Sequence, residues 1–217
     1  MTDDDSDICA VPSQSALRDI MGTPMDLAVR KQLGKLDRHC RAFIARSPFL
    51  CIGTADAEGK ADVSPRGDPA GFVQVLDDHT LIIPDRPGNN RLDTMTNIMA
   101  NPNVGLLFFI PGFEDTLRVN GRATIVSDPA LLERAAVIGK APKVAIRVAV
   151  EEAFLHCAKA LKRSRLWDAG SQLDRKAMPS LAKMILEQTA PPQKPPTAKE
   201  VAATDEHIEA DYKTGMY

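Results

Sequence analysis

The spacing of hydrophobic positions changes at Phe49, and this change divides the sequence into two kinds of structure. From there to about residue 154, short extended runs alternate with small, acidic or proline-containing turns, which is typical of an antiparallel β meander. Such runs, interrupted by isolated helices, favour a mainly β fold, an all-β barrel with helical additions, over a βαβ sheet. The runs are residues 49–56, 61–67, 71–76, 79–85, 104–110, 116–127 and 143–154.

Helical spacing is found before the first strand and between later strands. A helix is expected to begin near Pro24, because proline fits a first helical turn, and to end at Ser47-Pro48. Its apolar face is made by Leu27, Leu33, Leu36, Cys40, Phe43 and Ile44. Residues 90–100 return to helical spacing, and Ser127-Asp128-Pro129 signals the start of another helix.

These patterns predict three parts of the chain. Residues 1–23 are polar and without periodicity, so we expect an N-terminal arm. Residues 24–168 form the barrel domain with its N-terminal helix. Residues 169–217 form a helical extension, with a short helix at 181–186, the proline-rich spacer PPQKPP at 191–196 and a final helical segment.

Composition restricts the possible partners. The 217 residues carry a formal net charge of -2 and 44% hydrophobic side chains, which suits one principal domain and argues against a nucleic-acid partner. The N-terminus is acidic and no apolar run approaches the roughly 20 residues of a membrane span, so we expect a soluble, cytoplasmic protein without membrane contact. The four cysteines are scattered, so neither a metal site nor a disulfide framework is expected.

The turn PDRPGNNR at residues 84–91 concentrates the residues that could carry chemistry. It lies between a predicted strand and a predicted helix, where unpaired N–H groups and a positive partial charge favour anions. Two arginines and two asparagines add the donors that a phosphate needs. The alternative is an ordinary loop in which Asn90 caps the helix and the arginines are solvated.

Arg66 is the second basic residue of interest. If strand 61–66 lies beside strand 79–84, Arg66 can approach the same place as Arg91, and two converging arginines favour the anion site. The alternative interpretation is a surface arginine paired with Asp68.

The order of several short motifs resembles the pyridoxamine 5'-phosphate oxidase-like split β-barrel flavoproteins. The resemblance runs from about Phe49 to Trp167 and rests on the motifs VSPR (63–66), LIIPD (81–85), the GNNR turn, ANPNV (100–104), LLFF (106–109) and LRVNGRA (117–123). It implies a split antiparallel β-barrel of the FMN-binding type with about six strands and helices at both ends and between strands. It also implies a homodimer with the flavin at the subunit interface.

The resemblance further implies the residues that bind FMN. The phosphate contacts carried over are Arg66, Asn89, Asn90 and Arg91, with Arg86 as an addition. The flavin ring is expected against the main chain of Val63-Ser64 and Ile83-Pro84-Asp85. The true oxidase carries a Ser-Arg-Lys motif and another C-terminal tail, so the Asn-Asn-Arg of this chain indicates an uncharacterised branch and argues against that oxidase activity.

Arg118 and Trp167 complete the candidate site, acting across the expected dimer. Trp167 is the single tryptophan, in the basic segment ALKRSRLWD at 160–168, and is expected to cover the flavin or a substrate. The alternative is a hydrophobic anchor for the C-terminal extension. Arg118 either faces the site or pairs with Glu114 and Asp115.

We therefore expect an FMN-dependent oxidoreductase that passes a hydride between flavin N5 and a small organic substrate or reductant. The cofactor carries that chemistry, so no catalytic side chain is assigned. The main alternative is a non-catalytic binder of flavin, or of haem or deazaflavin, with His156 as an available haem ligand. A protein-interaction domain that binds a phosphorylated partner is a third hypothesis.

Overall fold

The computed structural model describes residues 10–217, and its contacts group the chain into two units, Met1–Gln32 and Leu33–Tyr217. The first unit contains α1 (Gln14–Met21) and α2 (Asp26–Arg30). The side chain of Ser13 accepts a hydrogen bond from the main chain of α1, so a helix forms where the sequence predicted only an arm. Residues 1–9 of that arm lie outside the described residues, and the three-part division stays a prediction.

The single helix expected between residues 24 and 46 is wrong. The helix stops after α2, and the main chain of Leu33 exchanges two hydrogen bonds with Ala153, at 3.0 and 2.8 Å. A residue that pairs with a strand cannot also continue a helix, so a new helix, α3 (Arg38–Ile44), starts after the Asp37 cap. Of the predicted apolar face, Leu36 and the α3 residues Cys40, Phe43 and Ile44 are the part that reaches the core.

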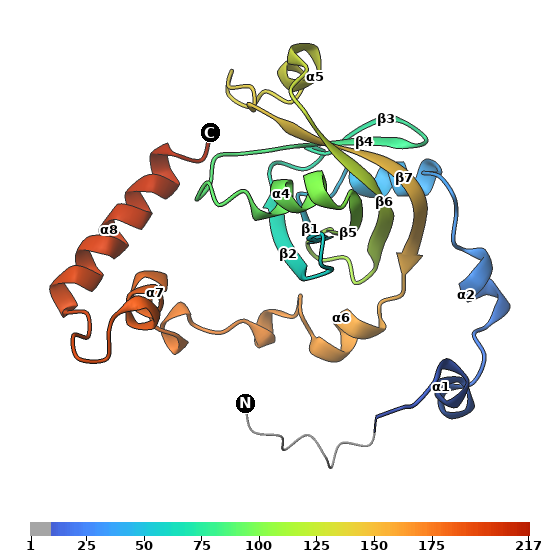
Figure 1. Ribbon diagram of the computed structural model, residues 1–217, viewed down its shortest axis with the longest axis horizontal. Coiled ribbons are helices and arrows are strands. Elements are labelled where there is room, and N and C mark those ends of the chain that lie inside the picture. The colour runs from blue at the N-terminus through green and yellow to red at the C-terminus, as the bar shows by residue number, and fades with distance from the viewer. Residues whose placement is uncertain (1–9) are drawn as a thin grey trace. The chain divides into compact units, whose positions relative to one another are not determined.

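A seven-stranded antiparallel sheet forms the body of the second unit (Figure 1). Its order is β2-β1-β5-β6-β7-β4-β3. This confirms the mainly β fold with helical additions, although the sheet has seven strands where about six were expected. The strands are β1 (Phe49–Ala55), β2 (Ala61–Gly67), β3 (Gln74–Asp77), β4 (Thr80–Pro84), β5 (Asn103–Phe109), β6 (Thr116–Val126) and β7 (Ala145–His156).

The core explains why β4 is apolar from Leu81 to Pro84. All five of its residues are buried. Ile83 belongs to the main cluster, which also contains the fully buried Phe108. Ile82 points to a smaller cluster with Leu132 of α5 (Pro129–Glu133), so helices or strands cover both faces of β4.

The condition considered for Arg66, that strands 61–66 and 79–84 lie side by side, is not met in the sheet, because β2 lies at one edge and four strands separate it from β4. The two strands nevertheless approach each other: Arg66 of β2 and Asp85, which follows β4, form an ion pair at 2.5 Å. The sheet must curl to bring these segments together, as a barrel does. α4 (Asp93–Ala100) packs against β1, β2 and β6 beside this approach (Figure 1).

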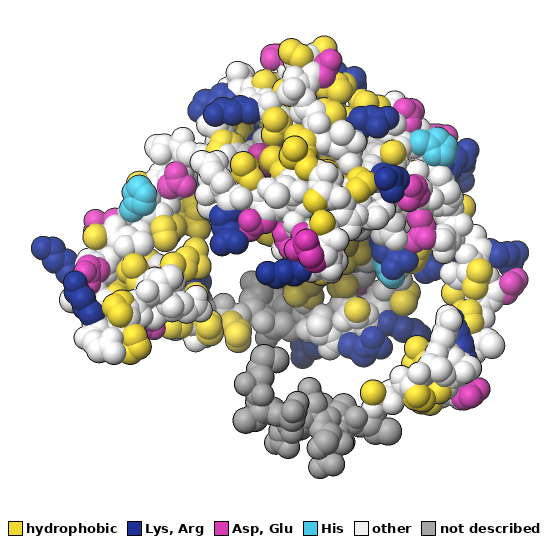
Figure 2. Space-filling view, in the orientation of Figure 1, with side chains coloured by type: hydrophobic (Ala, Val, Ile, Leu, Met, Phe, Trp, Pro, Cys, Tyr) yellow, Lys and Arg dark blue, Asp and Glu magenta, His cyan; other side chains and the backbone are white. Residues whose placement is uncertain are grey.

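Helices dominate the chain after β7. The predicted helix at 181–186 and the final helical segment are both confirmed, and these two helices pack on each other. None of the described helices is long and apolar enough to cross a membrane. Basic and acidic side chains are interspersed over the visible face (Figure 2). The elements are α6 (Lys159–Ser164), short 3-10 turns at 169–171 and 175–177, α7 (Leu181–Thr189) and α8 (Ala198–Thr214).

Gly121 is required by the close approach of β6 and β7 at the bulge between Asn120 and Gly121. A Cβ atom there would lie 2.1 Å from the main-chain oxygen of Ala149. We expect Gly121→Ala to lower the free energy of unfolding by about 1–3 kcal/mol, the usual cost of overpacking. Chemical denaturation measures it. Gly105→Ala is the matched control, since its Cβ would meet only Asn120 Oδ1 at 3.5 Å, and equal stability of both variants would contradict the prediction.

Candidate functional site

A cleft of about 1060 Å³ opens where β2, the end of β4 and the start of α4 meet. Its volume lies just above the roughly 300–1,000 Å³ typical of ligand sites. Five basic side chains and three carboxylates line it. The basic residues are Arg66, Arg86, Arg91, Lys140 and Lys143, and the acidic residues are Asp62, Asp85 and Asp93.

One face of β2 supplies the floor of the cleft. Successive side chains of a strand alternate between its two faces, so Asp62, Ser64 and Arg66 point the same way. Asn97 of α4 donates hydrogen bonds to Asp62 Oδ2 at 3.2 Å and to Thr54 Oγ1 at 3.1 Å. These bonds hold α4 over β2, and they place the N-terminus of the helix beside Ser64 and Arg66.

The N-terminus of α4 is open to the cleft. Its N-cap residue, Leu92, has a left-handed backbone with φ 60° and provides no side-chain cap. The capping role considered for Asn90 is therefore wrong; Asn90 itself has φ 57°, and the neighbouring Asn89 accepts a hydrogen bond from the Arg91 main chain at 3.1 Å. First-turn N–H groups lack intrahelical acceptors, so an anion in the cleft can accept from them.

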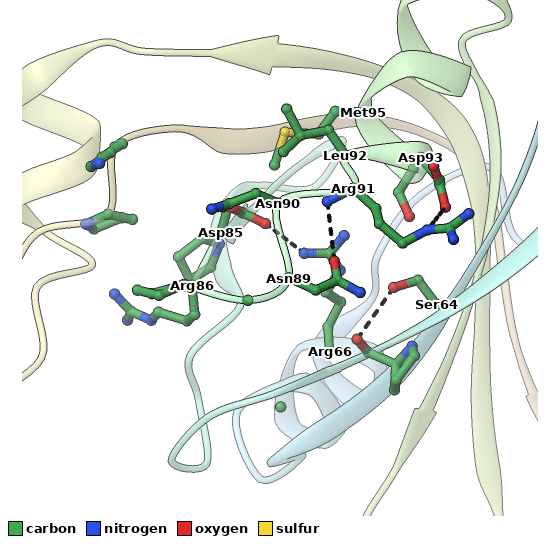
Figure 3. Close-up of a pocket in the computed structure, with 18 of the residues that line it drawn as sticks. Ser64, Arg66, Asp85, Arg86, Asn89, Asn90, Arg91, Leu92, Asp93 and Met95 are labelled. Atoms are coloured by element: carbon green, nitrogen blue, oxygen red, sulfur yellow. Dashed lines mark hydrogen bonds and ion pairs between the residues drawn. The ribbon is translucent and has the colours of Figure 1, made fainter. Parts of the chain in front are cut away.

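Carboxylates hold the three arginines of the cleft in place. Arg66 pairs with Asp85, and Arg91 pairs with Asp93 at 2.8 Å. The proposed pairing of Arg66 with Asp68 is wrong, because Asp68 instead accepts from Arg86 at 2.6 Å. Figure 3 shows Arg86 and Arg91 directed to opposite sides of the turn. Arg86 is thus committed to a protein carboxylate, whereas Arg66 lies where the turn and β2 meet.

Some donors in the cleft have no acceptor. The Arg66 Nε atom is buried and has no hydrogen-bond partner among the described residues. A buried guanidinium N–H without an acceptor is costly, and a ligand in the cleft that supplied one would offset that cost. The Arg118 Nε atom, outside the cleft, is unpaired in the same way. Ser64 donates only a long hydrogen bond, 3.5 Å, to the Pro65 carbonyl. Arg66, Ser64 and the uncapped helix end fit a phosphate group.

The main-chain segments predicted to contact the flavin ring differ in what they offer. β2 is an edge strand, so part of its main chain is unpaired, and Val63 and Ser64 line the cleft. Pro84 has no N–H, and the Asp85 N–H donates to the Val144 carbonyl at 3.1 Å. Ile83 is fully buried. The end of β4 can therefore offer carbonyl acceptors, while donors must come from β2.

Arg118 and Trp167 lie outside this cleft. Arg118 pairs with Glu152 at 3.1 Å, rather than with Glu114 or Asp115, and stacks on Phe154. Trp167 donates to the Phe113 carbonyl at 2.7 Å, which suits an anchor for the segment after β7. His156 ends β7, also outside the cleft. Any contact of Arg118 or Trp167 with a ligand in this cleft would have to come from another copy of the chain.

Lys140, Lys143 and Tyr217 are among the cleft residues that sequence reasoning missed, as are the acidic Asp62 and Asp93. The two lysines precede β7, which pairs antiparallel with β4 so that Ala145 faces Pro84. That register would have placed them beside the turn, but no local motif reveals it. Tyr217 is far away in sequence and carries no signal. No group of three or more His, Cys, Asp or Glu that could hold a metal occurs in residues 10–217.

A comparison with protein-family models matches residues 36–157 to the family described as pyridoxamine 5'-phosphate oxidase. The chain belongs to this family. The match covers the barrel and confirms the resemblance. Members of the family bind flavin or haem, and some act as oxidoreductases.

Comparisons with individual proteins give weaker likenesses. No curated protein matches the sequence. HupZ of Group A Streptococcus is 22% identical (TM-score 0.46), with 55% of this chain and 93% of that chain covered. General Stress Protein 26 of Bacillus anthracis is 20% identical, with a TM-score of 0.39, and the match covers 52% of this chain and 88% of that chain. A protein described as F420 reductase is 18% identical, with a TM-score of 0.41, and the match covers 56% of this chain and 98% of that chain. Each covers little more than half of this chain.

The left-handed backbone of Leu92 gives a test of the cleft geometry. Asparagine tolerates this conformation and a β-branched residue does not, so Leu92→Val should lower the free energy of unfolding by about 1–2 kcal/mol relative to Leu92→Asn. Thermal or chemical unfolding measures the difference. Leu92 is half exposed, so lost packing is a minor term. If the valine variant is as stable as the asparagine variant, residue 92 is not left-handed in solution.

Proposed function

We propose that the cleft binds FMN, with the phosphate held between Arg66 of β2 and the start of α4. The observation that carries the proposal is the buried Arg66 Nε atom, which lacks an acceptor beside an uncapped helix N-terminus. A phosphate dianion supplies acceptors to both. Membership of a family whose members bind flavin or haem supports this choice of ligand.

Each cleft residue has a distinct role in this proposal. Arg66 and Arg91 bind the phosphate while keeping their carboxylate partners, and Asn89 and Asn90 add amide donors from the turn. Arg86 shapes the turn by its bonds to Asp68 and to the Ala135 carbonyl at 2.7 Å. The main chain of Val63 and Ser64 and the carbonyl oxygens at the end of β4 orient the ring.

We further propose that the protein is an oxidoreductase. Bound FMN would supply hydride exchange at N5 with a small organic molecule. The chain's own residues would then bind and orient the cofactor. A homodimer with flavin at its interface would let Arg118 and Trp167 reach the cleft of the other copy. Both residues are partly exposed, and both lie outside the cleft of their own chain.

The phosphate assignment is tested by comparing FMN with riboflavin, which lacks the phosphate. We expect the wild type to bind FMN more tightly than riboflavin. Arg66→Met should weaken FMN binding by about 10- to 100-fold, the loss expected for hydrogen bonds to a charged group, and should leave riboflavin binding unchanged. Quenching of flavin fluorescence measures both affinities.

The matched control is Arg122→Met. Arg122 is exposed on β6, outside the cleft, with one long hydrogen bond of 3.4 Å to Asn103. The Arg122→Met variant should bind FMN and riboflavin with the affinities of the wild type. Equal loss of FMN and riboflavin affinity in Arg66→Met would indicate misfolding or a different pose, and an unchanged FMN affinity would place the phosphate elsewhere.

The oxidoreductase proposal is tested with the flavin-loaded protein under anaerobic conditions. Addition of NADH or NADPH should bleach the flavin absorption band faster than it bleaches the same concentration of free FMN. The Arg66→Met variant, loaded at saturating FMN, should be reduced at a similar rate because the phosphate is remote from N5. A protein that binds FMN but accelerates reduction by neither donor would favour the non-catalytic flavin binder.

A further inference from the structure

The segment that follows α8 reaches the cleft of the barrel. Tyr217 lines the cleft together with Arg86 and Lys140. Its hydroxyl donates to Asp68 Oδ1 at 2.7 Å, and its main-chain oxygen accepts from Lys140 Nζ at 2.7 Å. The guanidinium of Arg86 lies 5.4 Å from the centre of the Tyr217 ring. Three separate parts of the barrel therefore contact one residue of the C-terminal extension.

Asp68 is the centre of this arrangement. Only 1% of its side chain is exposed, and a carboxylate so buried is stable only when its oxygens are paired. Arg86 supplies one partner, to Oδ2, and the Tyr217 hydroxyl supplies the other, to Oδ1. Tyr217 is therefore part of a buried polar network.

The helix before Tyr217 packs on α7, but its own side chains do little to attach it to the barrel. α8 begins with a capping box between Thr197 and Glu200, which stabilises the helix itself. None of its side chains is buried, so it presents no apolar face that would hold it on the barrel. The contacts of Tyr217 join the end of this helix to the rim of the cleft.

We propose that Tyr217 is a ligand-retention residue: docked on the Asp68–Arg86 pair and on Lys140, it closes one end of the cleft and slows the release of the bound flavin. The retention half of this proposal rests on the proposed function. Docking leaves Arg66 and the α4 N-terminus free, since Tyr217 bonds to neither. Lys143 makes no hydrogen bond or ion pair among the described residues and remains available to the same ligand.

The titration of Tyr217 tests docking without any flavin. The hydrogen bond to Asp68 raises the pKa of the Tyr217 hydroxyl, burial and the charge of Asp68 add to the rise, and Arg86 opposes it. Lys140 faces the main-chain oxygen. Because the folded-state pKa is raised, docking is complete below the ordinary value of about 10 and is lost as pH rises through the raised value.

The chain contains two tyrosines, so a Tyr212→Phe background isolates Tyr217 in an ultraviolet titration of tyrosinate. We expect a midpoint above about 10 in that background, and a lower midpoint when Asp68→Asn is added. Thermal unfolding at neutral pH checks that the double variant is folded. A midpoint at the ordinary value, unmoved by Asp68→Asn in a folded protein, would overturn docking.

The rate of FMN release tests retention. Tyr217→Phe keeps the ring and removes the hydroxyl, and we expect release about tenfold faster than from the wild type, as for loss of one hydrogen bond to a charged group. Tyr212→Phe, an exposed tyrosine of α8 outside the cleft, should release FMN at the wild-type rate. Flavin fluorescence after dilution measures each rate.

The possible results separate the two proposals. Equal release from Tyr217→Phe and the wild type, with FMN bound normally, would overturn retention and leave the proposed function standing. Failure of the wild type to bind FMN would overturn the proposed function and retention with it, while the titration would still decide whether Tyr217 is docked.

Discussion

The ion pair between Arg66 and Asp85 joins two segments that the sheet itself keeps apart. β2 is an edge strand and β4 lies near the opposite edge, so no ladder of hydrogen bonds connects them. The pair spans this gap at 2.5 Å, and both side chains are about four-fifths buried. An ion pair with this degree of burial depends on geometry supplied by the rest of the fold. That geometry comes from the curl of the sheet, and the cleft is formed where the pair closes it.

Elements defined by local chemistry could be predicted from the sequence. The strand runs and the interruptions between them follow from alternation and turn residues, and the helix after the turn is found within residues 90–100 as expected, although it begins at Asp93. The helix predicted from the local pattern across Leu33 does not form, because a long-range contact replaces it. Leu33 has helical spacing in the sequence, but its main chain pairs with Ala153, 120 positions away, and the helix is broken there.

The distinction between local chemistry and long-range contacts applies to the cleft as well. Arg66 and the 84–91 turn were identified because they are chemically unusual where they stand, whereas the neighbour relation considered for their strands is not met in the sheet. The actual relation arises from closure of the whole sheet. Lys140, Lys143 and Tyr217 are ordinary residues in their local sequence, and only the antiparallel register of β7 on β4 and the path of the C-terminal segment bring them to the cleft.

Carboxylates offset the positive charge of the arginines that line the cleft. Arg66, Arg86 and Arg91 each have an acidic partner, which reduces repulsion among them and fixes their side chains before anything binds. In the proposed binding mode a phosphate would share Arg66 with Asp85, and the nearby negative charge would offset part of the attraction. The donors without a protein acceptor, Arg66 Nε and the first-turn amides of α4, are the groups to which the proposal assigns the phosphate.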